Sequence, residues 1–315
     1  MERIRHRFTF SLLLILLLTL SGLTQDTVMN VSDRIVTLRE VVVRNNLNVP
    51  AFIERVRRDT SFYKAFKNLK VLGYTALNDI RMTDKKGKVK STLQSKTRQS
   101  VDKGCRTMEV LEEKITGDLY DENRNWNYYT AELYAGLFLV KGTVCGENNI
   151  VSGKDFNVKS KSGIAKHKEQ LKMLFFNPGV RIPGLPFIGD KIALFEEDVA
   201  RYYDFVIDMA DHQGQNCYIF MVKARDDLSG KDKDQVVINT ITTWFNSQTM
   251  EIVARDYDLS YNAGVYDFDV HMEVQMEKFE DYVVPRLIRY TGNWHALFKK
   301  REKGFFTATL FDFKR

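Results

Sequence analysis

The side chains that could hold a metal or move a proton are scattered along this chain. Four histidines follow the first 24 residues, and none stands in an H-E-x-x-H pattern or a similar metal-site spacing: His167, His212, His271 and His295. No G-x-S-x-G turn for a serine nucleophile and no glycine-rich phosphate loop occur either. We therefore predict no catalytic residue, no metal ion and no cofactor, and we expect a protein that is not an enzyme.

Two acidic groups have the residue types that bind cations. Asp269, His271 and Glu273 alternate with apolar residues and would share one face of a strand, where a solvated surface explains them better than a metal. The second group surrounds Gly230 and consists of Asp226, Asp227, Asp232 and Asp234. Lysines alternate with its last two aspartates, and the glutamate that closes an EF-hand loop is missing, so we expect a polar loop.

The stretch 266–277 is the most regular part of the sequence. It reads Y-D-F-D-V-H-M-E-V-Q-M-E, so apolar residues fill every second position. This alternation predicts a strand with one apolar and one polar face, and the strand is longer than the roughly five or six residues usual in globular proteins. Its length suits a large curved antiparallel sheet whose concave face holds something apolar.

The C-terminal part, about 202–313, continues the pattern through seven strands joined by short turns. Between 250 and 261 the apolar positions change from even to odd, which predicts a β-bulge near Arg255 and Asp256. We predict an α+β fold: a large curved antiparallel sheet (half-barrel) with helices covering or plugging the concave face. The predicted lining is Tyr203, Phe205, Ile207, Trp244, Phe268, Val270, Met272, Val274 and Ile288. Packing of the same side chains under the helices, without a ligand cavity, is the alternative.

The N-terminal half supplies helices and further strands. A helix is predicted from Pro50 to about Leu69, capped by Asn48. Three strands should follow between 72 and 115, although the third, 105–115, also fits a helix. Further helices are predicted at 128–140 and 164–176.

The connector 177–189 is apolar but rich in proline. It reads N-P-G-V-R-I-P-G-L-P-F-I-G and holds three of the five prolines, so it cannot form a regular helix or a central strand. An apolar irregular segment must cover something. Together with the preceding helices, 128–189 is predicted to plug the concave face through Ile182, Leu185, Phe187 and Ile188, and a crossover that seals the core is the alternative.

Residues 202–262 resemble a known family. A strand ends in Trp and an apolar residue, an Asn turn with Thr follows, and the next strand reads apolar-x-apolar-x-basic, at Trp244, Phe245, Asn246, Thr249, Ile252 and Arg255. This pattern resembles the lipoprotein-carrier superfamily, the half-barrels of outer-membrane lipoprotein sorting (LolA/LolB-like). The resemblance implies a half-barrel and an apolar ligand, but this chain is longer than a simple carrier.

The first 24 residues have the order of a secretory signal peptide. Arg3, Arg5 and Arg7 precede an apolar run at 8–20, and Ser21 and Gly22 follow it. A membrane span needs about 20 apolar residues, so we predict cleavage rather than a retained anchor. No second span follows, and we expect a periplasmic or exported protein, with outer-membrane association left open.

Three cysteines remain after this segment. Cys105 and Cys145 stand at loop edges, whereas Cys217 lies within a strand pattern, so we predict a disulfide between the first two. Three unpaired buried thiols are the alternative.

The expected function is non-catalytic binding of a hydrophobic ligand, a lipid or a lipoprotein acyl chain, by one half-barrel domain spanning 25–315. A structural scaffold of an outer-membrane complex, without a ligand cavity, is the alternative. The partners would be a lipid or lipidated protein, or outer-membrane proteins for the scaffold. A net charge of +6 does not indicate nucleic acid. Two basic runs, 85–90 and 299–303, lie at turns, where they keep edges soluble or touch anionic lipid headgroups.

Overall fold

A single sheet organises the part of the chain that the structure describes. This computed structural model describes residues 26–31, 34–39, 42, 47–151, 170, 173–185, 187–262, 266–296 and 300–315. The predicted signal segment and most of the predicted helix at 164–176 lie outside these ranges. Within them, thirteen strands pair in the order β1-β2-β7-β8-β9-β10-β11-β12-β13-β3-β4-β5-β6. Only β2 and β7 pair in parallel among these described strands.

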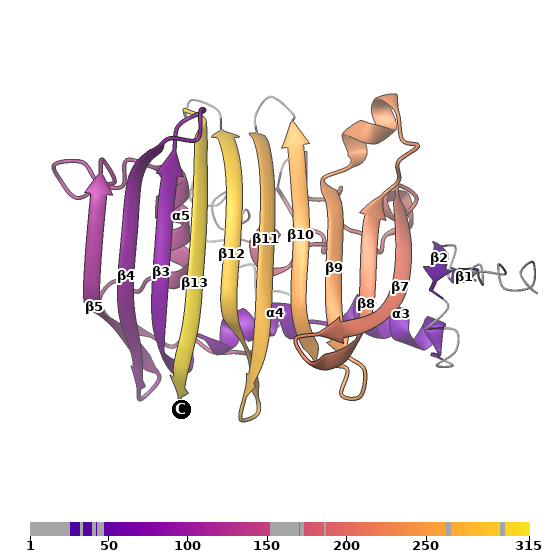
Figure 1. Cartoon of the computed structure of the whole chain (residues 1–315), viewed down its shortest axis with the longest axis horizontal. Coiled ribbons are helices and arrows are strands. Elements are labelled where there is room, and N and C mark those ends of the chain that lie inside the picture. Colours follow the sequence, from indigo (N-terminus) through magenta and orange to yellow (C-terminus); the bar gives the residue numbers. More distant parts are fainter. Residues whose placement is uncertain are drawn as a thin grey trace, which may run out of the picture.

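The predicted fold class is confirmed: the sheet is open and curved, mostly antiparallel, with few helices (Figure 1). The seven strands expected between 202 and 313 are all present. The strand bounds are β1 Thr27–Val31, β2 Arg34–Leu38, β3 Gly73–Thr83, β4 Val89–Asp102, β5 Cys105–Gly117, β6 Val144–Cys145, β7 Tyr203–His212, β8 Gln215–Ala224, β9 Ile238–Asn246, β10 Ile252–Asn262, β11 Tyr266–Phe279, β12 Tyr282–Ala296 and β13 Glu302–Lys314.

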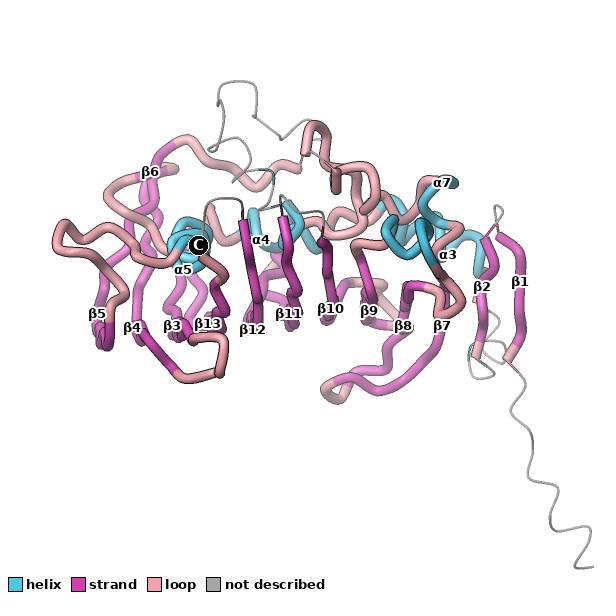
Figure 2. The backbone as a smooth tube through the Cα atoms, turned by 90° about the horizontal axis from the view of Figure 1, so that it is seen from above, coloured by secondary structure: helices cyan, strands magenta, loops and turns pink. Residues whose placement is uncertain are grey.

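Helices lie on one side of the sheet, which we call the covered face (Figure 2). They are α3 Val49–Arg58, α4 Ser61–Asn68, α5 Tyr129–Phe138 and the short α7 Glu197–Ala200, and a 3-10 helix, η1, spans Gly230–Gln235 in the β8–β9 connection. The Asn48 cap is confirmed, because its side-chain oxygen accepts a hydrogen bond from the Ala51 amide at 3.1 Å.

The single helix predicted from Pro50 to Leu69 is wrong in one respect, because it is two helices. The chain breaks at Asp59 and Thr60, where the Asp59 carboxylate accepts hydrogen bonds from the Ser61 amide at 3.2 Å and the Ser61 hydroxyl at 2.9 Å. These local bonds compete with the helical backbone bonds and start a new helix. The second helix, α4, packs against β12 on the covered face.

The predicted bulge exists but lies earlier in β10. The register shifts between Ile252 and Ala254, so that Ile252 pairs with Phe245 and Arg255 pairs with Thr243. The extra residue places Arg255 and the following odd positions on the covered face. A second shift lies between Asp258 and Leu259.

The last strand, β13, connects the strands of the N-terminal half of the chain to those of the C-terminal half. β13 pairs with β3, with Phe306 opposite Ile80 and Lys303 opposite Thr83. The strands of the N-terminal half therefore extend the same sheet as the C-terminal meander. This pairing continues the covered face from β7 to β5.

Candidate functional site

The covered face of the central strands is apolar and buried. Eight of the nine predicted lining residues lie there with at most 4% of their surface exposed: Tyr203, Phe205, Ile207, Phe268, Val270, Met272, Val274 and Ile288. They come from β7, β11 and β12, where every second side chain points to the same face. The alternation thus brings together residues up to 85 positions apart in the sequence.

The ninth residue, Trp244, lies on the other face of the sheet. Its neighbour Phe245 points to the covered face, where its ring centroid is 6.0 Å from that of Phe52 in α3. Adjacent residues of a strand point to opposite faces, so Trp244 turns away and packs 4.8 Å from the His212 ring. Because two aromatic residues are adjacent, the sequence pattern does not show which of them points to the covered face. The register of β9 on β10 determines that it is Phe245.

A largely irregular segment closes part of the apolar covered face. We call residues 173–185 and 187–200 the cover segment. It begins with a helical turn at 173–176 and ends with α7, and its described residues between 177 and 196 form no helix or strand. Ile182, Leu185 and Ile188 of the predicted plug are at most 4% exposed, whereas Phe187 is 60% exposed. Phe187 also has a φ of 66°, a left-handed conformation that few large side chains adopt.

Few polar contacts hold the cover segment on the sheet. The Tyr257 hydroxyl donates to the Phe175 carbonyl at 2.6 Å, and the Tyr261 hydroxyl donates to the Phe187 carbonyl at 3.2 Å. At its far end, the Lys191 ammonium donates to the Asp234 carbonyl at 2.8 Å. The same ammonium donates to the Tyr261 hydroxyl at 3.1 Å, and apolar packing adds to these contacts.

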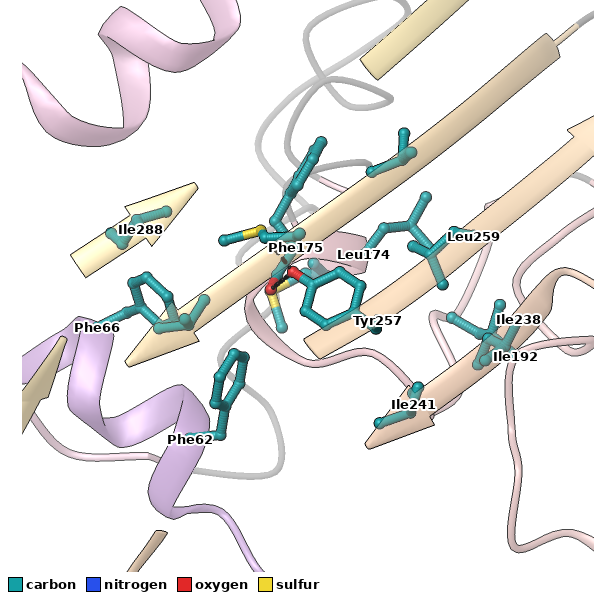
Figure 3. Close-up of a cluster of buried hydrophobic side chains, with 14 of the residues drawn as sticks. Phe62, Phe66, Leu174, Phe175, Ile192, Ile238, Ile241, Tyr257, Leu259 and Ile288 are labelled. Carbon is teal, nitrogen blue, oxygen red and sulfur yellow. Dashed lines mark hydrogen bonds between the residues drawn. The ribbon is translucent and has the colours of Figure 1, made fainter. Parts of the chain in front are cut away.

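The cover segment fills the space beneath it. Leu174 and Phe175 are 1% and 2% exposed, and Figure 3 shows both close to Tyr257 and Leu259 of β10. The Phe175 ring lies 5.3 Å from that of Tyr290 and 6.2 Å from that of Trp294. A ligand can therefore reach the covered face here only if the cover segment moves.

A buried cation lies on the same face. Arg255 is 9% exposed, its Nε donates to the Thr243 hydroxyl at 2.9 Å, and its guanidinium lies 4.4 Å from the Phe62 ring centroid. Burial lowers the pKa of Arg255. In the sequence, this residue was identified only as the basic residue that ends the pattern resembling the lipoprotein-carrier superfamily. The bulge before it directs its side chain to the covered face.

The covered face becomes polar toward β3 and β4, which the sequence analysis did not anticipate. The Asn78 amide donates to the hydroxyls of Ser95 and Thr97, both at 3.3 Å, and all three residues are buried. Beyond them, the Gln99 amide donates to the Leu69 and Leu72 carbonyls at 2.6 and 2.7 Å. Asn78 is the sequence feature that could have predicted this polar region, because it stands at an even position where the other even-numbered residues of β3 are apolar.

The predicted acidic groups lie on exposed surfaces. His271 Nδ1 lies 2.7 Å from Asp258 and Nε2 lies 3.2 Å from Glu273, on the uncovered face of the sheet. Near η1, Lys223 pairs with Asp226 at 2.7 Å, and Arg225 pairs with the next aspartate at 2.6 Å. Among the described residues, no three or more His, Cys, Asp or Glu side chains are arranged to hold a metal ion.

The predicted disulfide is confirmed. Cys105 and Cys145 are bonded, with an S–S distance of 2.08 Å, and the bond fastens the short β6 to the start of β5. Cys217 is a free buried thiol in β8, and burial raises its pKa.

Comparisons with known proteins give distant structural similarity only. No family model matches the chain, and no curated protein matches it. Similar solved structures include a DUF1329 family protein from Desulfovibrio piger, with 11% identity, 81% of this chain and 93% of that chain covered, and a TM-score of 0.26. A domain assigned to outer membrane lipoprotein-sorting proteins, from Vibrio parahaemolyticus, has 10% identity, 84% and 89% coverage, and a TM-score of 0.27.

A LolA superfamily protein from Nitrosomonas europaea is also similar, with 9% identity, 81% and 93% coverage, and a TM-score of 0.23. With TM-scores below 0.3, the similarities establish neither the ligand nor the activity of this chain. Within the described residues, no helix has the length and apolarity that crossing a bilayer requires.

Proposed function

We propose that this is an exported cell-envelope protein whose half-barrel binds a hydrophobic ligand, a lipid or the acyl chain of a lipoprotein, without catalysis. The observation that carries the proposal is that a largely irregular segment, beside the helices α3 and α4, closes the apolar covered face over β10 and β11. In this proposal residues 25–315 act as one domain. The ligand enters between the sheet and the cover segment.

The cover segment is the part of this face that opens most easily. Its described residues between 177 and 196 lack the hydrogen-bond ladder that holds each central strand, and segments with few such bonds open at lower free energy than core strands. Opening exposes Met272, which is 2% exposed and whose sulfur lies 2.7 Å from the same Tyr257 hydroxyl that holds the Phe175 carbonyl. Burying ligand methylenes there contributes about 0.8 kcal/mol each, so an acyl chain offsets the cost of lifting the cover segment.

The eight buried lining residues are the proposed ligand contacts on the sheet. Among them, Met272 has a flexible thioether that adapts to apolar groups of varied shape. The opposing contacts come from the cover segment, chiefly Ile182, Leu185 and Ile188. Trp244, on the other face, has no role in this proposal.

Two features support export. The apolar run at 8–20 follows a basic start, as in a signal peptide. The disulfide between Cys105 and Cys145 suits an oxidising compartment.

Titration with dansyl-labelled undecanoic acid tests the proposal. We expect saturable fluorescence enhancement that added phospholipid reverses, and an organic extract of the protein from its native envelope should contain lipid in a stoichiometric amount. A linear response that phospholipid does not displace would count against ligand binding.

A scaffold in an outer-membrane complex is the second candidate. The observation that favours it is the filling of the covered face by the protein's own Leu174 and Phe175. In that case the protein should co-purify with a defined partner, and its organic extract should hold no lipid.

A further inference from the structure

Two basic turns that are far apart in the sequence lie side by side. The β3–β4 turn, residues 84–90, holds four lysines and one aspartate, and residues 300–303 hold three basic residues and one glutamate. They meet because β3 pairs with β13, with Thr83 opposite Lys303. Figure 1 shows the β3–β4 turn and the start of β13 at the same end of the sheet.

The side chains of the two turns converge on one open pocket. Its lining is Asp84, Lys85, His295, Lys300 and Arg301. We call the whole group the basic rim: Lys85, Lys86, Lys88, Lys90, Lys300, Arg301 and Lys303.

The acid of the first turn is committed to holding the turn. The Asp84 carboxylate accepts hydrogen bonds from the backbone amides of Lys86 at 2.9 Å and Lys88 at 3.0 Å. These bonds hold the pKa of Asp84 below its usual range, so it stays ionised. The backbone of the turn is therefore held in place, and its single carboxylate, which also lies 3.7 Å from the Lys90 ammonium, faces four lysines.

An exposed apolar side chain stands among these lysines. Val89 lies between Lys88 and Lys90 and is 49% exposed, in a turn where Lys85 and Lys86 are exposed as well. Ammonium groups around a small apolar tip match the boundary of a lipid bilayer, where headgroups carry charge and acyl chains begin just below. A single polar ligand would leave the valine without a partner.

We propose that the basic rim docks the protein on a membrane surface that contains anionic phospholipids. Each lysine close to such a surface strengthens binding about fivefold. The rim lies beside the start of α5, because the Glu302 carboxylate accepts hydrogen bonds from the amides of Tyr129 at 2.9 Å and Thr130 at 2.8 Å. Docking thus places this end of the half-barrel against the bilayer, and it does not depend on ligand binding in the covered face.

Vesicle co-sedimentation tests this proposal. The protein should lack residues 1–24, whose apolar run would insert into any vesicle, and it keeps every described residue. We expect sedimentation with vesicles of phosphatidylcholine and phosphatidylglycerol but not with phosphatidylcholine alone. Binding should disappear near 1 M salt, where charges are screened beyond about 3 Å.

Matched lysine variants locate the surface. The pair Lys86→Gln and Lys88→Gln should weaken binding roughly 25-fold. The pair Lys231→Gln and Lys233→Gln removes the same charge from exposed positions in η1 and should bind like the parent. Equal losses in both pairs, equal binding to uncharged vesicles, or tighter binding to a short DNA duplex than to vesicles would overturn the proposal. Neither pair is buried, so unfolding midpoints should stay unchanged.

Discussion

The hydroxyl of Tyr257 donates a hydrogen bond to the carbonyl oxygen of Phe175 at 2.6 Å, and this bond ties the sheet to the cover segment (Figure 3). Tyr257 is 1% exposed, and burial raises its pKa well above the ordinary value, so the hydroxyl stays a donor at any physiological pH. The Phe175 carbonyl lies at the end of a helical turn, 173–176, where backbone acceptors need other partners. The bond therefore stabilises the closed arrangement directly.

Tyr257→Phe should lower stability and raise ligand affinity at the same time. Loss of the hydroxyl leaves a buried carbonyl without its donor, which costs about 1–3 kcal/mol in urea unfolding. If about 1 kcal/mol of this loss favours opening of the cover segment, the apparent affinity for the dansyl probe rises about fivefold. Tyr282→Phe is the control, because Tyr282 is half-buried on β12 and away from the cover segment. Reduced affinity in Tyr257→Phe would show that the closed arrangement is the binding form.

The hydrogen bond between Arg255 and Thr243 allows a second test, which measures how much this bond to a buried charge contributes to stability. Thr243→Val removes the acceptor of the Arg255 Nε at 2.9 Å and should destabilise the protein by about 1.5–3 kcal/mol, because the hydrogen bond involves a charged group. Adding Arg255→Met to that variant should recover much of the loss, since the unpaired charge is removed as well. Urea unfolding of the single and double variants measures the coupling. Additive losses would show that the two side chains act independently.

Titratable side chains on the uncovered face should make the stability of the protein depend on pH. Burial, reinforced by nearby Glu273, raises the pKa of Asp256 to about 6. A carboxyl with a higher pKa in the folded state than its unfolded value of about 3.9 binds more protons when folded, so stability falls as pH rises from about 4 to 6. Because Asp256 is only half-buried, the expected change is about 1–2 kcal/mol.

The titration of His271 should also lower the stability of the protein as pH rises. Burial alone would lower its pKa, but hydrogen bonds to Asp258 and Glu273 raise it overall, so its contribution is present at low pH and is lost as pH rises through the folded value. Unfolding between pH 4.5 and 7 should therefore show a stability loss that Asp256→Asn reduces. Asp269→Asn, on the same face, is the control and should keep the full slope. An unchanged slope in Asp256→Asn would refute the assignment to this carboxyl.

Reduction of the disulfide should have a large cost. The bond between Cys105 and Cys145 closes a loop of 40 residues, for which chain entropy alone corresponds to about 4 kcal/mol. Thermal unfolding with and without dithiothreitol measures the effect, and Cys105→Ser with Cys145→Ser should reproduce it. A reductant effect that persists in the double variant would point to Cys217 instead.

The two-residue periodicity was enough to predict the architecture. In a half-buried antiparallel strand, the alternation of apolar and polar residues shows which side chains share each face of the sheet. It could not decide between adjacent apolar residues: Trp244 and Phe245 are both plausible inward positions until the register with Ile252 is known. The bulge was predicted from the same change of period but was placed too late. Its location depends on which strand residues pair, and pairing is not local information.

The helices show a different limit. The apolar stripe of 49–66 continues through Asp59 and Thr60, so the pattern alone predicts one helix, whereas α3 ends before Asp59 and the Asp59 carboxylate binds Ser61 at the start of α4. Polar residues pointing inward were also missed. Asn78 fits the covered face only because Ser95 and Thr97 come from the neighbouring strand to meet it.

Photo-crosslinking with a diazirine-bearing fatty acid, followed by peptide mass spectrometry, tests ligand binding under the cover segment most directly. We expect adducts on the cover segment and on the covered face of β10–β12, at residues such as Phe175 and Met272, and unlabelled fatty acid should suppress them. Adducts confined to the uncovered face or the sheet edges, or none that unlabelled fatty acid suppresses, would contradict a ligand site between sheet and cover segment.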